Sequence, residues 1–149
     1  MRVESLKYAR SLQVLLERKT VGKVWGSQAE QFHSLRGLDS LRKTISAFGE
    51  QHPYTKLVPD LKGIDPDDSF SRVPYEKGFY FLYYLQTLVG GPDAFAPFAK
   101  SYLSEFGAST ATTEQFKAAF LNFFSDCEAV KEVDWETWLF SPGAVATCL

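Results

Sequence analysis

The most constraining feature of this chain is a stretch that is apolar on nearly every side. It runs Phe79-Tyr80-Phe81-Leu82-Tyr83-Tyr84-Leu85 and continues with Leu88-Val89. Pro74 before it suits a first helical position, Val73 should be extended because it precedes a proline, and Gly90-Gly91 ends the run. A helix that is apolar all round is packed on several neighbours. The sequence therefore predicts one central helix, with the other elements arranged around it.

The rest of the chain carries amphipathic helical patterns. One predicted helix covers about residues 5–25, with Leu12, Leu15, Leu16 and Val24 on one stripe, and a second covers 27–48 with Phe32, Leu35, Leu38, Leu41, Ile45 and Phe48. Further helices begin at Pro92, after Thr112 and after Asp134, and capping boxes are expected at Ser27/Glu30 and Thr112/Gln115. No convincing strand or repeat is present. We expect an all-α fold of about six helices in an orthogonal bundle.

The helical pattern disappears from about residue 50 to 73. Three prolines and four aspartates occupy this segment, and interspersed apolar residues favour an ordered loop. Asp65, Asp67, Ser69 and Glu76 fall at positions 1, 3, 5 and 12 of a calcium-binding loop, but position 6 is Phe70 where that loop needs glycine. A solvated turn with helix-capping aspartates explains the segment better than a calcium site.

Charge and composition exclude several classes of protein. The net charge of −2 gives no basic surface for nucleic acid or anionic lipid, and no apolar run approaches the roughly 20 residues of a membrane helix. Cys127 and Cys148 form neither metal spacing nor a disulfide framework, which favours a cytoplasmic location. His33 and His52 lie 19 positions apart, so a helical His-Glu-x-x-His zinc site cannot form within this chain. We expect no metal site.

Tyr75 is the strongest candidate for chemistry that the residues themselves indicate. It begins a helix directly after the long acidic loop, where its hydroxyl can point into a cleft and donate to a developing oxyanion. The alternative is a core aromatic residue, one of many in this chain. The neighbouring Lys77 is expected to be solvated or to extend its amine to the surface.

The segment from Asp65 to Phe79, with Val-Pro-Tyr-Glu-Lys-Gly at 73–78, resembles the zinc aminopeptidases of the gluzincin type, in the branch of leukotriene-A hydrolase and aminopeptidase B. The resemblance also includes Leu16-Glu17-Arg18, the run from Phe48 to Val58, Leu88-Val89-Gly90-Gly91 and the run from Val133 to Gly143. It implies the helical part of a metallopeptidase catalytic domain over residues 14–143, an unmatched segment at 1–13 and a truncated linker at 144–149.

The resemblance also implies roles for individual residues. Tyr75 would stabilise the tetrahedral intermediate as the catalytic tyrosine, and Asp67 would line the pocket for the peptide amino terminus. Phe70 stands where the family has a second pocket tyrosine, which makes epoxide hydrolysis doubtful. The family's third zinc ligand would fall at Arg10, and an arginine cannot bind zinc. The two zinc histidines and the general-base glutamate would precede Met1.

Two main hypotheses follow from these observations. The first is a truncated zinc aminopeptidase homologue that holds no zinc itself and is inactive alone. The second is a non-catalytic helical interaction module, which associates through surfaces left uncovered by absent domains. A calcium-binding loop is a weaker third alternative.

Overall fold

The structure is a computed structural model that describes residues 5–63, 71–106 and 111–144. These residues form seven α-helices and one 3₁₀ helix, with no strand among them. In chain order the elements are α1 (Ser5–Trp25), α2 (Ser27–Phe48), η1 (Pro53–Thr55), α3 (Val73–Leu88), α4 (Pro92–Phe106), α5 (Thr113–Phe123), α6 (Glu128–Lys131) and α7 (Trp135–Phe140). The predicted all-α fold is confirmed. The additional helix is α6, a single turn that the sequence pattern does not indicate.

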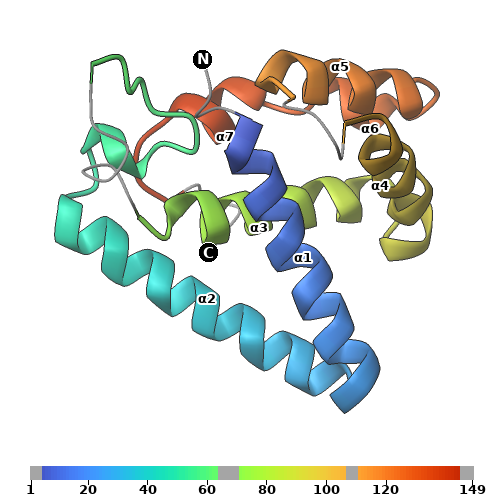
Figure 1. Cartoon of the computed structure of the whole chain (residues 1–149), viewed down its shortest axis with the longest axis horizontal. Coiled ribbons are helices and arrows are strands. Elements are labelled where there is room, and N and C mark those ends of the chain that lie inside the picture. The colour runs from blue at the N-terminus through green and yellow to red at the C-terminus, as the bar shows by residue number, and fades with distance from the viewer. Residues whose placement is uncertain (1–4, 64–70, 107–110, 145–149) are drawn as a thin grey trace.

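Helix α3 is the central element, as its apolar composition predicts. Phe81 and Leu85 have no exposed surface, and Leu82 is 1% exposed. Helices α1 and α2 pack against α3 and against each other, while α4 to α6 gather at the far end of α3 (Figure 1). Burying the apolar surface of one helix on several neighbours gives the fold its main hydrophobic stabilisation.

An aromatic core joins α3 to the C-terminal helices. The Phe98 ring of α4 meets the Phe120 ring of α5 edge to face at 5.2 Å between centroids. Trp135 contacts both Phe81 and Phe120, at 5.4 and 6.0 Å. Edge-to-face pairs at these separations stabilise beyond their buried area. Many of the aromatic residues therefore pack α3, α4, α5 and α7 against one another.

Local capping signals were correct at two helices and wrong at one. The predicted capping box of Thr112 and Gln115 opens α5 with both reciprocal hydrogen bonds. Asp134 caps α7, and the hydrogen bonds from the backbone and side chain of Thr137 lower the pKa of its carboxyl group. The box predicted at Ser27 is absent, because Gly26 occupies the N-cap position.

Helix α3 begins one residue earlier than the sequence predicts. Val73 was expected to be extended, because a residue before proline avoids the helical region. It instead starts the helix and is fully buried, together with Leu41 and Ile45 of α2. Burial of this β-branched side chain between α2 and α3 supplies the tertiary contact that outweighs the local preference.

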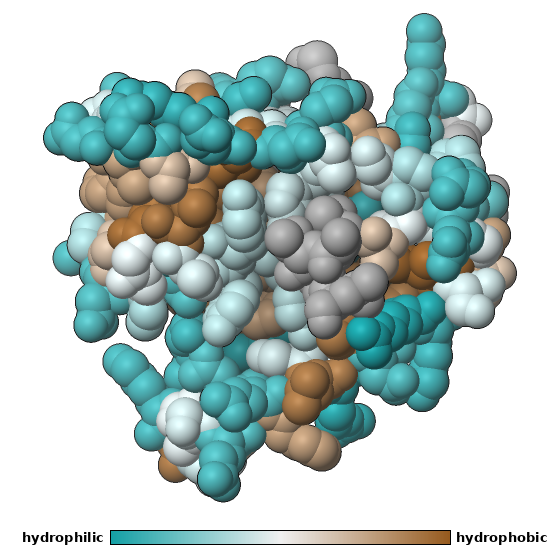
Figure 2. Space-filling model, turned by 180° about the vertical axis from the view of Figure 1, so that it is seen from behind, coloured by the Kyte–Doolittle hydropathy of each residue, from teal (hydrophilic) through white to brown (hydrophobic). Residues whose placement is uncertain are grey.

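The surface leaves several apolar side chains uncovered. The largest exposed fractions are at the junction of α1 and α2, where Trp25 is 72% and Leu35 64% exposed. Figure 2 shows apolar surface in separate patches among polar residues on the back of the molecule. Leu35 was predicted to lie on a buried stripe with Leu41, but only the C-terminal half of that stripe is covered. None of the described helices combines the length and apolarity that crossing a bilayer requires.

Candidate functional site

Tyr75 lies in the first turn of α3, at the edge of a hollow of about 440 Å³ between α1, α2 and α3. The side chain is half-buried. The hollow is lined by Gln13, Val14, Glu17, Arg18, His33, Arg36, Gly37, Ser40, Arg72, Tyr75 and Glu76. Polar and charged groups predominate in this lining, so the tyrosine ring stands beside a hydrated recess rather than within the aromatic core.

The residue before Tyr75 is tied to α1. The buried hydroxyl of Ser11 donates a hydrogen bond of 2.9 Å to the carbonyl oxygen of Pro74. Gly78, one turn later, allows this approach, because a Cβ atom there would overlap the Ser11 side chain. The small residues at positions 11 and 78 therefore let α1 and α3 cross closely at the start of α3.

The residue after Tyr75 is held by a buried ion pair. Arg18 donates from Nη2 to Oε2 of Glu76 at 2.6 Å, with side-chain exposures of 6% and 11%. The Arg18 guanidinium also lies 3.9 Å from the ring centroid of Phe79. A Cβ atom at Gly37 of α2 would overlap both partners of the pair. The ion pair thus joins α1 to α3 in a space that only a glycine in α2 leaves open.

Lys77 has a structural role that differs from the predicted solvated one. Its side chain has no exposed surface. The ammonium group donates to the carbonyl oxygens of Thr55 at 3.1 Å, Ser141 at 2.8 Å and Gly143 at 2.9 Å. Three carbonyl acceptors satisfy the three donors of an ammonium group, which makes its burial tolerable. Lys77 therefore anchors the start of α3 to both the η1 segment and the chain after α7.

Thr55 completes this anchor on the η1 side. Its hydroxyl accepts a hydrogen bond of 2.8 Å from the Gly143 amide and donates one of 2.6 Å to the carbonyl of His52. His52 accepts from the Tyr54 amide through Nδ1 and stacks on Phe48 at 5.3 Å between centroids. His52 is thus a structural residue of this turn.

The described residues around Tyr75 do not form a zinc site. The resemblance places the third zinc ligand at position 10, and the Arg10 guanidinium lies 5.2 Å from the centroid of the Tyr75 ring. A guanidinium carries a permanent positive charge and no lone pair for a metal. Within residues 5–63, 71–106 and 111–144, no group of three or more His, Cys, Asp or Glu could hold a metal ion. The positive charge beside the Tyr75 ring is therefore the guanidinium of Arg10.

The other predicted residues are placed as follows. Asp67 and Phe70 lie outside the described residues, as do Asp65, Ser69 and Cys148. Glu76, the last position of the calcium pattern, is committed to Arg18. His33 is exposed at the rim of the Tyr75 hollow, and Cys127 is half-buried before α6.

Sequence reasoning proposed Tyr75 as a site residue but gave no indication of the residues that hold the chain on either side of it. Ser11, Arg18 and Lys77 come from distant parts of the chain, and periodicity carries no signal for their polar contacts. The sequence offered one indication of these contacts. The hexapeptide Val-Pro-Tyr-Glu-Lys-Gly combines apolar, aromatic, acidic, basic and small residues within six positions. Here each residue has a separate contact: Val73 with α2, Pro74 and Gly78 with Ser11, Glu76 with Arg18, and Lys77 with three carbonyls.

Comparison with known proteins gives consistent matches. The peptidase family M1 domain matches residues 7–138. Leucine aminopeptidase 2 of Sclerotinia sclerotiorum is 46% identical over 136 residues, and leukotriene A-4 hydrolase of Xenopus laevis is 42% identical over 131 residues. Each alignment covers 87% of this chain and 22% of the relative.

Solved structures agree with the sequence matches. The native leukotriene A4 hydrolase of Saccharomyces cerevisiae superposes with a TM-score of 0.87 at 36% identity, over 92% of this chain and 22% of that one. The yeast enzyme in complex with bestatin gives a TM-score of 0.86 over 91% of this chain. The chain thus spans about a fifth of the length of these relatives. On the family match, the sequence identities and the shared helical fold, it belongs to peptidase family M1, among relatives named leucine aminopeptidase 2 and leukotriene A-4 hydrolase.

Proposed function

We propose that this chain provides the helical part of an M1 aminopeptidase catalytic domain, with Tyr75 as the residue that stabilises the tetrahedral intermediate. The single observation that carries the proposal is the frame around Tyr75. Pro74 is bonded to Ser11, and Glu76 to Arg18, so both neighbours of the tyrosine are anchored to α1. A donor that is already fixed in place loses little freedom when charge develops, which is the requirement for oxyanion stabilisation.

The chemistry assigned to Tyr75 is hydrogen-bond donation. A peptide carbonyl oxygen gains negative charge as its carbon becomes tetrahedral, and the phenol O–H donates to that oxygen. Removing one preorganised donor of this kind lowers kcat by about 10²–10³-fold. Asp67 and Phe70 are proposed to line the adjacent substrate pocket on the resemblance alone, and Phe70 lacks the hydroxyl that would support epoxide hydrolysis.

We further propose that these 149 residues do not hydrolyse peptides by themselves. The sequence has no His-Glu-x-x-His motif, and Arg10 stands at the position of a zinc ligand beside Tyr75. Purified chain should show no turnover of an aminoacyl amide and no stoichiometric zinc by elemental analysis. Turnover that depends on stoichiometric zinc would overturn this part of the proposal. A cytoplasmic location remains a prediction from the cysteine content.

The role of Tyr75 has to be tested in a protein that has peptidase activity. In a chimera, residues 14–143 replace the matching segment of Xenopus laevis leukotriene A-4 hydrolase, so Arg10 is left out. The chimera should hydrolyse an aminoacyl amide, and Tyr75→Phe should lower its kcat by about 10²–10³-fold with little change in KM. Tyr54→Phe, on the η1 turn, is the matched control. A Tyr75→Phe chimera with unchanged kcat and normal zinc content would refute the assignment.

A second candidate function is association through uncovered apolar surface. Val24, Trp25, Phe32 and Leu35 are each at least 60% exposed near the junction of α1 and α2. Sedimentation of the chain over a range of concentrations tests this function, with Trp25→Ser as the variant. Reversible self-association that Trp25→Ser abolishes would favour the interaction module. A monomer at every concentration would count against self-association.

A further inference from the structure

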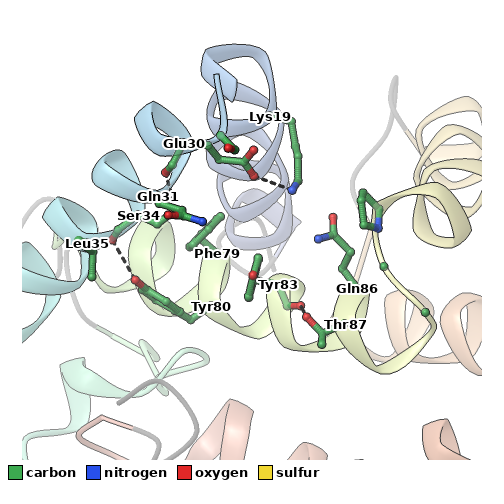
Figure 3. A pocket seen from close by; sticks show the side chains of 14 residues that line it. Lys19, Glu30, Gln31, Ser34, Leu35, Phe79, Tyr80, Tyr83, Gln86 and Thr87 are labelled. Atoms are coloured by element: carbon green, nitrogen blue, oxygen red, sulfur yellow. Dashed lines mark hydrogen bonds and ion pairs between the residues drawn. The ribbon is translucent and has the colours of Figure 1, made fainter. Parts of the chain in front are cut away.

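A second hollow lies away from Tyr75, between the end of α1, the first half of α2 and the outer face of α3. It has a volume of about 690 Å³ and shares no lining residue with the Tyr75 hollow. We call it the α2–α3 pocket. Its central residues are Lys19, Glu30, Leu35, Phe79, Tyr83 and Gln86 (Figure 3). Pockets of about 300–1,000 Å³ are typical of small-molecule sites.

Gln86 is the unusual residue of this pocket. The residue is only 4% exposed, yet its side-chain amide makes no hydrogen bond within the described part of the chain. Figure 3 shows the amide end directed away from α3 into the pocket, toward Tyr83 and Lys19. Among the described residues, the fully buried side-chain atoms without a partner are Arg18 Nη1 and Thr113 Oγ1, so the Gln86 amide itself reaches the open space of the pocket. A ligand with a donor and an acceptor side by side would satisfy it.

The two charged groups of the pocket and the Tyr80 hydroxyl are already committed to other partners. Lys19 pairs with Glu30 at 2.6 Å, so the two charges neutralise each other. The Tyr80 hydroxyl donates to the carbonyl oxygen of Ser34 at 2.9 Å. No unpaired charge therefore lines the described interior of the pocket. This arrangement selects a neutral ligand over an anion or a cation.

The remaining surface of the pocket is apolar and partly aromatic. Phe79 is buried at its base, and the ring of Tyr83 is 45% exposed. The Lys19 ammonium lies 6.0 Å from the centroid of that ring, which contributes to holding it in place. Leu35 extends the apolar wall and is 64% exposed. A flat apolar side chain can therefore pack on Tyr83 while a neighbouring amide reaches Gln86, and Leu35 lies farther along the pocket (Figure 3).

We propose that the α2–α3 pocket binds a neutral peptide unit, namely an apolar residue flanked by amides, with the amide bonded to Gln86 and the apolar side chain packed on Tyr83. The proposal is independent of the role of Tyr75. It gives this chain a second peptide-binding position, which rests on the Gln86 amide that faces the pocket and on a charge-neutral aromatic lining.

The test is a titration of the ¹⁵N-labelled chain with N-acetyl-L-phenylalaninamide, followed by NMR. The Gln86 side-chain NH₂ signals, identified by their loss in Gln86→Leu, should shift in a saturable way together with amides of α3. Gln86→Leu should weaken binding about tenfold or more, because the ligand amide then loses its partner. The exposed rim variant Gln31→Leu is the matched control.

Two further measurements keep the proposal falsifiable. N-acetyl-L-phenylalanine, whose carboxylate has no free cation to meet, should bind more weakly than the amide. Tyr83→Ala, at a half-exposed position that tolerates truncation, should also weaken binding. The proposal is overturned if the probe gives no saturable shifts, or if Gln86→Leu, or Tyr83→Ala where Gln86→Leu fails to fold, binds the probe as the parent does.

Discussion

Replacing Gly37 with alanine tests the packing that positions Tyr75. In an ordinary helix interior, Gly→Ala stabilises by about 1 kcal/mol, because alanine restricts the unfolded chain and favours the helix. Gly37 is buried in α2 against the Arg18–Glu76 ion pair. A new Cβ atom would overlap Arg18 Nη2 and Glu76 Oε2 and would come within 2.9 Å of Glu76 Cδ. The substitution therefore forces the ion pair apart or moves α2 away from α3.

The magnitude follows from the burial of the pair. Side-chain exposures of 6% and 11% place both charges away from solvent. Disrupting a buried ion pair costs about 3–5 kcal/mol, and the helical gain of alanine offsets about 1 kcal/mol of that. We expect Gly37→Ala to lower the free energy of unfolding by about 2–4 kcal/mol. For a chain of this size that corresponds to a fall in Tm of roughly 4–16 °C.

Gly22→Ala is the matched control, because it is also a helical glycine beside a charged pair. The three atoms nearest to its Cβ would all belong to the Glu30 side chain, which is 24% exposed and whose carboxylate end can swing toward solvent. We expect a change within about 1 kcal/mol of zero. Urea unfolding followed by circular dichroism measures both variants. A Gly37→Ala chain as stable as the parent, or a Gly22→Ala chain equally destabilised, would refute the reasoning.

Two further predictions concern the anchor and the aromatic core. Lys77→Met should lower the free energy of unfolding by about 3 kcal/mol or more, because three carbonyl oxygens lose their donor; urea unfolding measures it, and unchanged stability would exclude the anchoring role. Burial and the nearby Glu105 raise the pKa of Tyr102 from 10.0 to about 12, so the folded chain holds this proton more tightly and loses stability as the pH rises from about 10 to about 12. The Tm of Tyr102→Phe should fall less than that of the parent between pH 10 and about pH 12. Equal falls in Tm for the two proteins would contradict a raised pKa at Tyr102.

Much of the secondary structure could be predicted from local signals. Thr112 and Gln115 cap a helix wherever it lies, because their hydrogen bonds join residues three apart. Gly49 ends α2 with a φ of 95°, a conformation that glycine adopts readily. The Ser27 prediction failed because Gly26, with a φ of 91°, took the cap position, while Glu30 paired with Lys19 across the helix junction.

The candidate site divides in the same way. The central place of α3 and the position of Tyr75 at its start could be predicted from the sequence, since apolar content and a proline act locally along the chain. The roles of Lys77 and Glu76 depend on the three-dimensional packing and could not be predicted. The partners of Lys77 lie 22 to 66 residues away in the sequence, and the partner of Glu76 lies 58 residues away. From sequence alone, a long charged side chain is predicted to be solvent-exposed. Its burial is tolerable only where distant parts of the chain supply hydrogen-bond or ion-pair partners, because the energy of burying a charge depends on those partners.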